Sequence, residues 1–178
     1  MTLTLTTARL TLRPPEISDA LAVTRYLNNF AVAGNLATVP YPYCVSDAQN
    51  WLSRQSGRPP QETGFALDLE GAGYVGQVGF HQERGGATLG YWLGEPFWYR
   101  GLMTEAVTAV VAWYFSAVPD AKILSGVFHF NKASLAIQKK LGFVVTATSR
   151  RHCLARGEEV RHIDTELTRA AWTERLQT

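Results

Sequence analysis

Cysteine is scarce in this sequence, whose 178 residues include two, Cys44 and Cys153. Neither belongs to a CxxC pair or to a cysteine–histidine spacing that is typical of a metal site. The pattern therefore predicts two reduced thiols, as is usual in the cytoplasm, and no bound metal.

Charged residues are also scarce, at 18% of the chain against about 25% in a typical soluble domain. The net charge of +2 and the pI near 8.6 are too mild to indicate nucleic acid or a membrane as partner. A low charged fraction favours a buried cleft or a contact between subunits. A monomer or a homodimer is expected.

Long hydrophobic runs are missing as well, because no apolar stretch approaches the roughly 20 residues that cross a bilayer. Residues 1–16 alternate threonine and leucine and lack the basic and apolar regions of a signal peptide. These features predict a soluble, cytoplasmic protein.

Strand-like and helix-like segments alternate along the chain and predict one mixed α/β domain over residues 1–178. Alternating runs predict strands at residues 9–14, 64–70, 74–82, 87–94, 121–130, 143–150 and 158–168. Helical spacing and caps predict helices at residues 19–29, 46–55 and 131–142, and a long apolar helix that begins near Gly101.

One glycine motif, GAGYVG at residues 71–76, matches the dinucleotide-binding pattern G-x-G-x-x-G. That pattern binds a pyrophosphate only where it opens a helix. Here it continues into YVGQVGFHQ, which alternates like a strand, so the glycines are expected to form a hairpin turn.

The long apolar helix begins without an obvious cap, because residues 98–101 read WYRG. About four N–H groups at a helix start have no partner within the helix. The ordinary explanation is a partial cap by Thr104 and a favourable dipole interaction with Glu105. The alternative is an anion site, in which Gly101 lets a diphosphate approach the backbone and Arg100 adds positive charge.

A second strand-to-helix junction carries the sequence NKAS at residues 131–134. Asn131 is a good N-cap in any fold, and Ser134 is an ordinary first-turn residue. However, two such junctions, after residues 87–94 and after 121–130, would bring both helix starts to one end of the sheet. Open α/β sheets bind ligands at such ends.

The segments LGYWLGEPFWYRGLMTEAV and FHFNKASLAIQKKLGF resemble the acetyl-CoA-binding core of the GCN5-related N-acetyltransferases (GNAT). More narrowly, they are similar to the RimJ/RimL-type branch, which acetylates the N-termini of ribosomal proteins. The resemblance covers essentially the whole chain, with its core at residues 87–143. It implies a mostly antiparallel, twisted sheet of about six or seven strands, a V-shaped splay between two central strands, and about four packed helices.

The resemblance also implies the residues that hold acetyl-CoA. The family's pyrophosphate loop, Q/R-x-x-G-x-G/A, falls on residues 98–103, where this chain keeps the central glycine but has tryptophan first and methionine last. Unpaired backbone groups of Trp92 and Leu93 would pair with the pantetheine arm. The full expected set is Trp92, Leu93, Trp98, Arg100, Gly101, Met103, Thr104, Asn131 and Ser134. Lys132 or Arg100 would reach the ribose phosphate.

The implied reaction is direct attack of a primary amine on the acetyl thioester in a ternary complex. A backbone N–H near Trp92 and Leu93 would stabilise the oxyanion, and Ser134 would donate to the leaving thiolate. The general base stays open among His81, Tyr91, Glu95, His129 and a water chain. His152 and His162, in the last pair of strands, show no metal-ligand spacing.

Two other functions remain open on the sequence. The first is a catalytically silent module that binds or senses acyl-CoA, and the second is an interaction protein whose aromatic residues face a partner. For an enzyme, the expected acceptor is a peptide N-terminus or a small amine. The first two predicted helices and the loop at residues 37–47 would shape its site.

Overall fold

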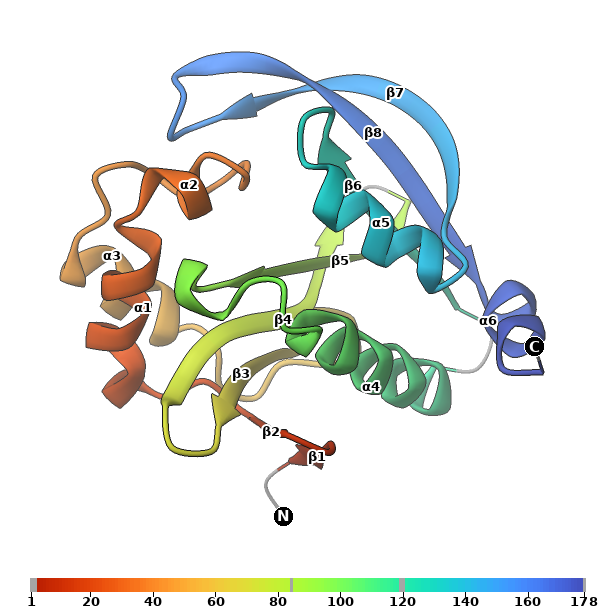
Figure 1. Ribbon diagram of the computed structural model, residues 1–178, viewed down its shortest axis with the longest axis horizontal. Helices are drawn as coiled ribbons and strands as arrows, with labels where there is room; N and C mark the ends of the chain where they lie inside the picture. The colour runs from red at the N-terminus through yellow and green to blue at the C-terminus, as the bar shows by residue number, and fades with distance from the viewer. Residues whose placement is uncertain (1–2, 84, 119–120, 178) are drawn as a thin grey trace.

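The computed structural model describes residues 3–83, 85–118 and 121–177. Within these ranges, eight strands form one sheet in the order β1-β2-β3-β4-β5-β6-β8-β7 (Figure 1). The strands are β1 (Leu5–Thr6), β2 (Leu10–Arg13), β3 (Gly64–Leu69), β4 (Gly73–Glu83), β5 (Gly86–Leu93), β6 (Lys122–Phe128), β7 (Val144–Cys153) and β8 (Glu158–Thr168). The α-helices are α1 (Ala20–Leu27), α2 (Phe30–Ala33), α3 (Val45–Leu52), α4 (Leu102–Ala117), α5 (Lys132–Lys140) and α6 (Arg169–Arg175).

The predicted mixed α/β class and mostly antiparallel sheet are confirmed. The sheet has more strands than the six or seven expected, because β1 contains two residues, too few to show an alternating pattern. The short helices α2 and α6 were not predicted either. The glycines at residues 71–76 form the β3–β4 turn as expected, with φ of +78° at Gly71 and +70° at Gly73.

The centre of the sheet opens as a V between β5 and β6. Among the described strands these two are the parallel neighbours, and they pair at one position, Thr88 with Leu124. The next residues that face the same side are Gly90 and Gly126, and no pairing joins the strands there. The predicted splay is therefore confirmed.

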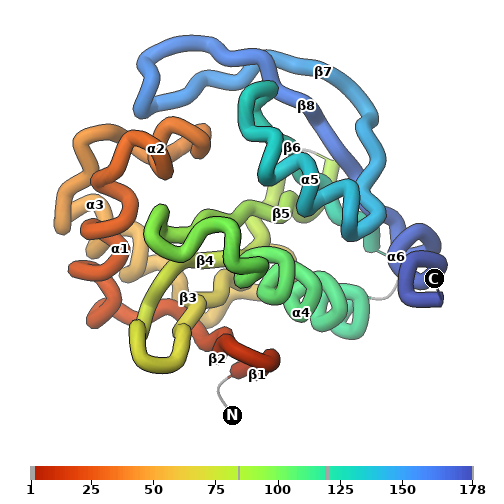
Figure 2. Tube along the Cα trace, in the orientation of Figure 1, coloured from red at the N-terminus to blue at the C-terminus, as the bar shows by residue number. Residues whose placement is uncertain are grey.

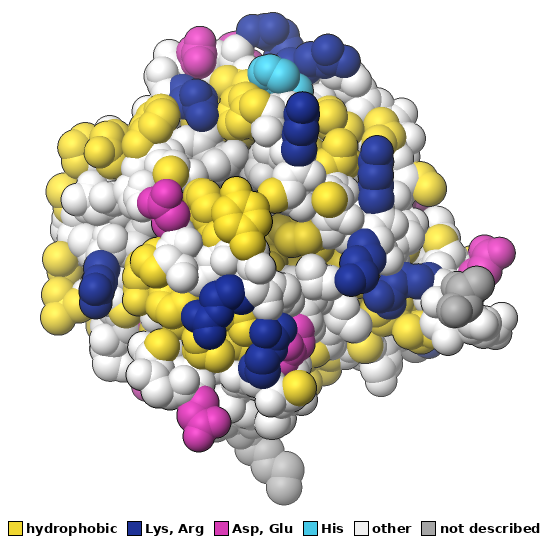
Figure 3. Space-filling view, in the orientation of Figure 1, with side chains coloured by type: hydrophobic (Ala, Val, Ile, Leu, Met, Phe, Trp, Pro, Cys, Tyr) yellow, Lys and Arg dark blue, Asp and Glu magenta, His cyan; other side chains and the backbone are white. Residues whose placement is uncertain are grey.

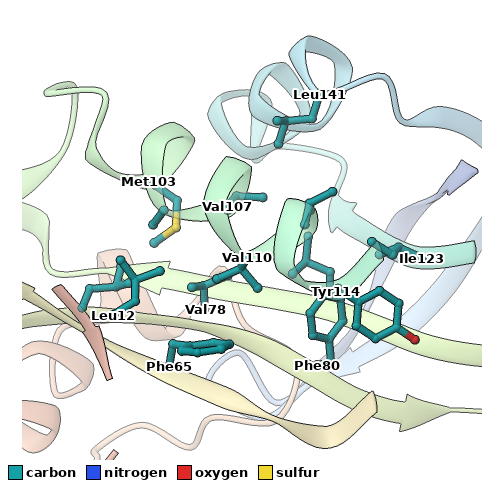
Figure 4. Packing of buried hydrophobic residues seen from close by; sticks show 14 of the residues in the cluster. Leu12, Phe65, Val78, Phe80, Met103, Val107, Val110, Tyr114, Ile123 and Leu141 are labelled. Atoms are coloured by element: carbon teal, nitrogen blue, oxygen red, sulfur yellow. The ribbon is translucent and has the colours of Figure 1, made fainter. Parts of the chain in front are cut away.

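Helices cover both faces of the sheet. On one face, α4 and α5 pack over Val78, Phe80 and Leu89 in the larger hydrophobic core, and side chains of α4 meet those of β4 (Figure 4). On the other face, α1 and α3 pack over Ala66 and Tyr74. Burial of each large apolar side chain contributes about 1.5–3 kcal/mol, so these two layers hold the V in place from both sides.

A buried polar chain crosses the point where the V begins. Ser125 Oγ donates to the Leu89 carbonyl (2.9 Å), and Gln138 Nε2 donates to Ser125 Oγ (2.9 Å). Thr165 Oγ1 in turn donates to Gln138 Oε1 (2.7 Å). One helix and three strands are thereby joined through buried polar side chains.

Replacing Gln138 by Met is expected to lower the free energy of unfolding by about 2 kcal/mol, because the buried hydroxyls of Ser125 and Thr165 each lose a partner. Urea unfolding would measure the loss. Lys139→Met is the matched control, since Lys139 is exposed on the same helix and should change stability by no more than about 0.5 kcal/mol. Equal effects of the two changes would show that the chain of hydrogen bonds does not support the V.

The β7–β8 hairpin is tied to the segment that follows α2. The Leu154 N–H donates to the Ala37 carbonyl (3.0 Å), and Arg156 Nε donates to the Gly34 carbonyl (2.8 Å). The Cα trace shows α2 beside the end of this hairpin (Figure 2). The V is thus bordered by the helices α1–α3, by the sheet and by the hairpin.

Candidate active site

A cleft of about 1250 Å³ occupies the V, and its lining comes from both faces of the sheet. On one face, called the α4–α5 side, it is lined by the starts of α4 and α5. On the other face, called the α1–α3 side, it is lined by α3 and residues 35–40. All nine residues that the resemblance implied for acetyl-CoA lie on this lining: Trp92, Leu93, Trp98, Arg100, Gly101, Met103, Thr104, Asn131 and Ser134.

The start of α4 lacks a side-chain cap. Gly101 occupies the N-cap position with φ of +73°, a left-handed conformation that suits glycine. Within the helix, the Glu105 N–H donates to the Gly101 carbonyl, and the N–H groups of residues 102–104 have no partner among the described residues. The partial cap by Thr104 was therefore a wrong prediction, and the free donors point out of the helix end, as an anion site requires.

Arg9 supports the loop before α4 and was missed on the sequence. Its Nη1 donates to the Arg100 carbonyl (2.8 Å), and its guanidinium pairs with Glu105 (2.7 Å). The Arg100 guanidinium lies over the Phe97 ring at 5.9 Å and has no ion pair with any described residue. Lys and Arg side chains are prominent on the face that carries α4 and α5 (Figure 3).

The backbone groups of β5 that face the V differ from those that the resemblance implied. The Leu89 carbonyl accepts from β6, so by alternation the backbone groups of Tyr91 and Leu93 also face the V. Those of Trp92 face β4, where its carbonyl lies against Gly76. The Leu93 carbonyl is taken by Trp98 Nε1 (2.7 Å). The expectation of free groups on Trp92 was wrong, and the free edge consists of Tyr91 and the Leu93 N–H.

Two hydroxyl groups meet on the α4–α5 side. Ser134 Oγ donates to the Tyr91 hydroxyl (2.8 Å), which donates to the Ser134 carbonyl (3.2 Å). Asn131 Oδ1 accepts from the Ser134 N–H, so Asn131 caps α5 as its ordinary interpretation predicts. Burial raises the pKa of Tyr91 to about 12, which disfavours it as a general base at neutral pH. The pair is suited to donating a proton.

Two other candidate bases lie outside the cleft lining. Glu95 accepts from Asn29 Nδ2 (2.5 Å), and the His129 ring lies near the Arg161 carbonyl (3.3 Å). His81 does line the cleft. Its Nε2 lies 3.0 Å from Glu83, a carboxylate already held by Arg151.

Arg151, on β7, bridges across the V to Glu83 of β4 through two contacts of 3.0 Å. These hydrogen bonds lower the pKa of Glu83 to about 2, so the carboxylate is ionised at neutral pH. The bridge closes the α1–α3 side of the V near its narrow end. Because Arg151 and Glu83 are far apart in the sequence, no local pattern indicated this contact.

His162 was given no role on the sequence, yet it lies in the cleft lining. Its Nδ1 is 2.7 Å from Asp164 Oδ1, and its ring packs against Gly126. The spacing of His162 and Asp164 places both on one face of a strand. That this strand adjoins β6 follows from the sheet order, which the sequence does not show.

The described part of the chain contains no group of three or more His, Cys, Asp or Glu residues arranged to hold a metal. Cys44 and Cys153 are both free thiols. In the same residues, no helix combines the length and the apolar character that crossing a membrane requires.

The sequence was compared with known protein families. Residues 9–144 match the family model described as Acetyltransferase (GNAT) domain. This chain belongs to the GNAT acetyltransferase family. The prediction of an acetyltransferase that uses acetyl-CoA, drawn from the resemblance, is confirmed at the level of the family.

Individual relatives agree with this family. The uncharacterized N-acetyltransferase p20 of Bacillus licheniformis is 30% identical over 146 residues, which are 79% of this GNAT chain and 82% of p20. Mycobacterium smegmatis RimJ, solved with CoA-disulfide, superposes with a TM-score of 0.81 at 22% identity, over 99% of this chain and 94% of that one. The microcin C7 self-immunity acetyltransferase MccE, solved with acetyl-CoA and AMP, superposes with a TM-score of 0.77 at 17% identity. The superposition covers 90% of this chain and 93% of MccE. The two solved structures confirm the fold.

Proposed function

We propose that this GNAT protein transfers the acetyl group of acetyl-CoA to a primary amine within a ternary complex. The observation that carries the proposal is that the uncapped start of α4 opens onto the same cleft as the free edge of β5. Free N–H groups beside a glycine suit a diphosphate, and an unpaired strand edge suits the amide-bearing pantetheine arm. The residues present therefore fit acetyl-CoA.

The N–H groups of residues 102–104 would hold the diphosphate, with Arg100 adding positive charge. Tyr91 and Leu93 would bind the pantetheine through their backbone groups. Acetyl-CoA, when bound, supplies an acetyl group activated as a thioester. The Leu93 N–H is the donor we assign to the developing oxyanion, because it faces the V and no partner strand takes it. The hydroxyls of Ser134 and Tyr91 hold a proton for the departing sulfur.

We propose that the acceptor, a peptide N-terminus or a small amine, enters from the α1–α3 side. There the lining includes Tyr43, Trp51 and Trp92, whose rings suit an amine with an apolar neighbour. The likeness to p20, which is named an N-acetyltransferase, supports an amino group as acceptor.

Acetyl-CoA is expected to stabilise the protein, whereas ATP and NAD should do so much less. A ligand that binds only the folded state adds about 2.7 kcal/mol at a hundredfold excess over its Kd. A thermal shift series would measure this effect. Absence of a shift with acetyl-CoA would contradict the proposal.

The acceptor is to be sought by following thiol release with peptides that have free N-termini, with small amines and with aminoglycosides. Release that depends on the amine would establish transfer. Tight binding of acetyl-CoA without release from any acceptor would favour the silent acyl-CoA-binding module instead.

A further inference from the structure

Two histidine rings flank the first unpaired position of the V, one on each arm. On β5, a Cβ added to Gly90 would lie 3.8 Å from the ring of His81. On β6, a Cβ added to Gly126 would lie 2.2 Å from Cε1 of His162, an impossible overlap. Glycine at residue 126 is therefore what allows the His162 imidazole to lie beside the opening.

His162 and Asp164 form a hydrogen-bonded pair in this position. Asp164 fixes the imidazole with a hydrogen on Nδ1, at 2.7 Å, and so leaves the lone pair on Nε2. Phe128 packs edge-on against the ring with centroids 5.7 Å apart, which restricts its rotation. Nε2 makes no hydrogen bond with any described residue, and His162 lines the cleft.

We propose that His162 is the general base that takes protons from the acceptor amine, and that Asp164 positions it. This inference rests on the proposed function, because it assigns a role within that reaction. His81 is less suited, since its Nε2 already faces Glu83 at 3.0 Å and its side chain is half exposed.

The electrostatic surroundings keep the His162 imidazole uncharged at neutral pH. Burial lowers its pKa and Arg151 of β7 lowers it further, against the opposing effects of Asp164 beside it and Glu83 of β4. His81, also on β4, and the groups Tyr43, Asp47, Arg54 and Arg58 from α3 and its flanking segments are the further titratable or charged side chains in the lining of this side. A neutral imidazole can accept a proton, whereas an imidazolium cannot.

Two buried hydroxyl oxygens on the same side lack partners. Thr88 Oγ1, on the residue of β5 that pairs with β6, has no hydrogen bond within the described structure, although Thr88 is only 7% exposed and lines the cleft. Ser149 Oγ, on the residue of β7 that pairs with His162, also has none, but Ser149 lies outside the cleft lining, so Thr88 alone of the two faces the cleft. Buried polar atoms without partners point to a missing ligand or water. A primary ammonium, with three N–H donors, has the complementary chemistry.

The proton balance of the reaction is consistent with this role. An ammonium loses two protons as it becomes an amide, and the leaving thiolate gains one. His162 Nε2 takes the first proton, which frees the nitrogen lone pair to form the C–N bond, and passes it to water. As the C–S bond breaks with its electron pair on sulfur, His162 takes the second proton and passes it to water as well. The hydroxyl pair of Ser134 and Tyr91 protonates the sulfur and regains its proton from water, so one proton is released in all.

The test compares His162→Gln with His152→Gln, a change of an exposed histidine on the same hairpin. Thiol release from acetyl-CoA is followed with water alone and with small primary amines of graded basicity, between about pH 6 and 9. His162→Gln should reduce release about 10²-fold and make the rate follow the fraction of amine that is already neutral, so that it falls steeply toward acid pH. The wild type, in which burial lowers the pKa of His162, should stay nearly constant over the same range. The loss of rate in His162→Gln should be smaller with amines that are already neutral at the pH of the assay. Asp164→Asn should act in the same direction, and His152→Gln should match the wild type.

Calorimetry with acetyl-CoA separates the possible failures. If the wild type does not bind acetyl-CoA, the proposed function is wrong and the role of His162 falls with it. If His162→Gln and His152→Gln both bind acetyl-CoA normally and release thiol at the same rate, with amines and with water alone, only the role of His162 is overturned. If His162→Gln misfolds, His162→Ala is tested in its place. Added imidazole should then restore thiol release by the alanine variant. A folded alanine variant that keeps its activity, or that imidazole does not rescue, contradicts the assignment.

Discussion

Gly101→Glu is expected to abolish acetyl-CoA binding while the protein stays folded. The new carboxylate would lie at the start of α4, beside the free N–H groups of residues 102–104. Two like charges about 4 Å apart repel by roughly 4 kcal/mol at an effective dielectric constant of about 20. Since about 1.4 kcal/mol is a tenfold change in Kd, affinity should fall by at least about a hundredfold. Calorimetry with acetyl-CoA measures it.

The control for Gly101→Glu is Gly71→Glu. Gly71 has a similar left-handed φ, +78° against +73°, and a Cβ there meets nothing within 4 Å. Both substitutions therefore add one negative charge and similar backbone strain, about 1–2 kcal/mol, but Gly71 lies in the β3–β4 turn, outside the cleft lining. If both variants bind acetyl-CoA as the wild type does, the diphosphate site is elsewhere.

The local features of the site could be predicted from the sequence because they depend on neighbours along the chain. An uncapped helix start with Gly101, and a capped one with Asn131, can be recognised from a few residues each. The structure places both on one cleft. The hairpin turn at residues 71–76 was likewise decided by the alternation that follows it.

Features that depend on the order of strands could not be predicted in this way. β8 lies between β6 and β7, which brings His162 to the V although its sequence neighbours give no sign of it. The wrong prediction of free backbone groups on Trp92 has a related cause. The register of pairing with β4 decides which backbone groups of β5 face the V. Arg9 supports the loop before α4 from a segment about ninety residues away in the chain.

The structure also changes the interpretation of Tyr91. On the sequence it was one of several candidate bases. Its hydroxyl instead accepts from Ser134 and donates to a carbonyl, and its pKa is raised by burial. Together with the neutral imidazole of His162 on the opposite face, this arrangement separates a proton donor on the α4–α5 side from a proton acceptor on the α1–α3 side. Such a separation suits a reaction in which the nitrogen loses protons and the sulfur gains one.

Ser134→Ala is expected to lower kcat for thiol release about 10²-fold, with little change in KM for acetyl-CoA. The hydroxyl would stabilise the departing thiolate, an interaction made mainly in the transition state, so its loss appears in kcat. Stability should fall by no more than about 1 kcal/mol, because the change removes one hydrogen bond, from Ser134 Oγ to Tyr91. Ser53→Ala, which removes an exposed hydroxyl from the end of α3, is the control.

Tyr91→Phe completes the test of this pair. If the two hydroxyls act as one donor, each single variant should lose most of the activity, and the double variant should lose little more. Additive losses would mean that Ser134 and Tyr91 act separately. If instead Ser134 is only a first-turn helix residue, Ser134→Ala should turn over at the wild-type rate with its best acceptor. That outcome would remove Ser134 from the chemistry and leave the sulfur to be protonated by water.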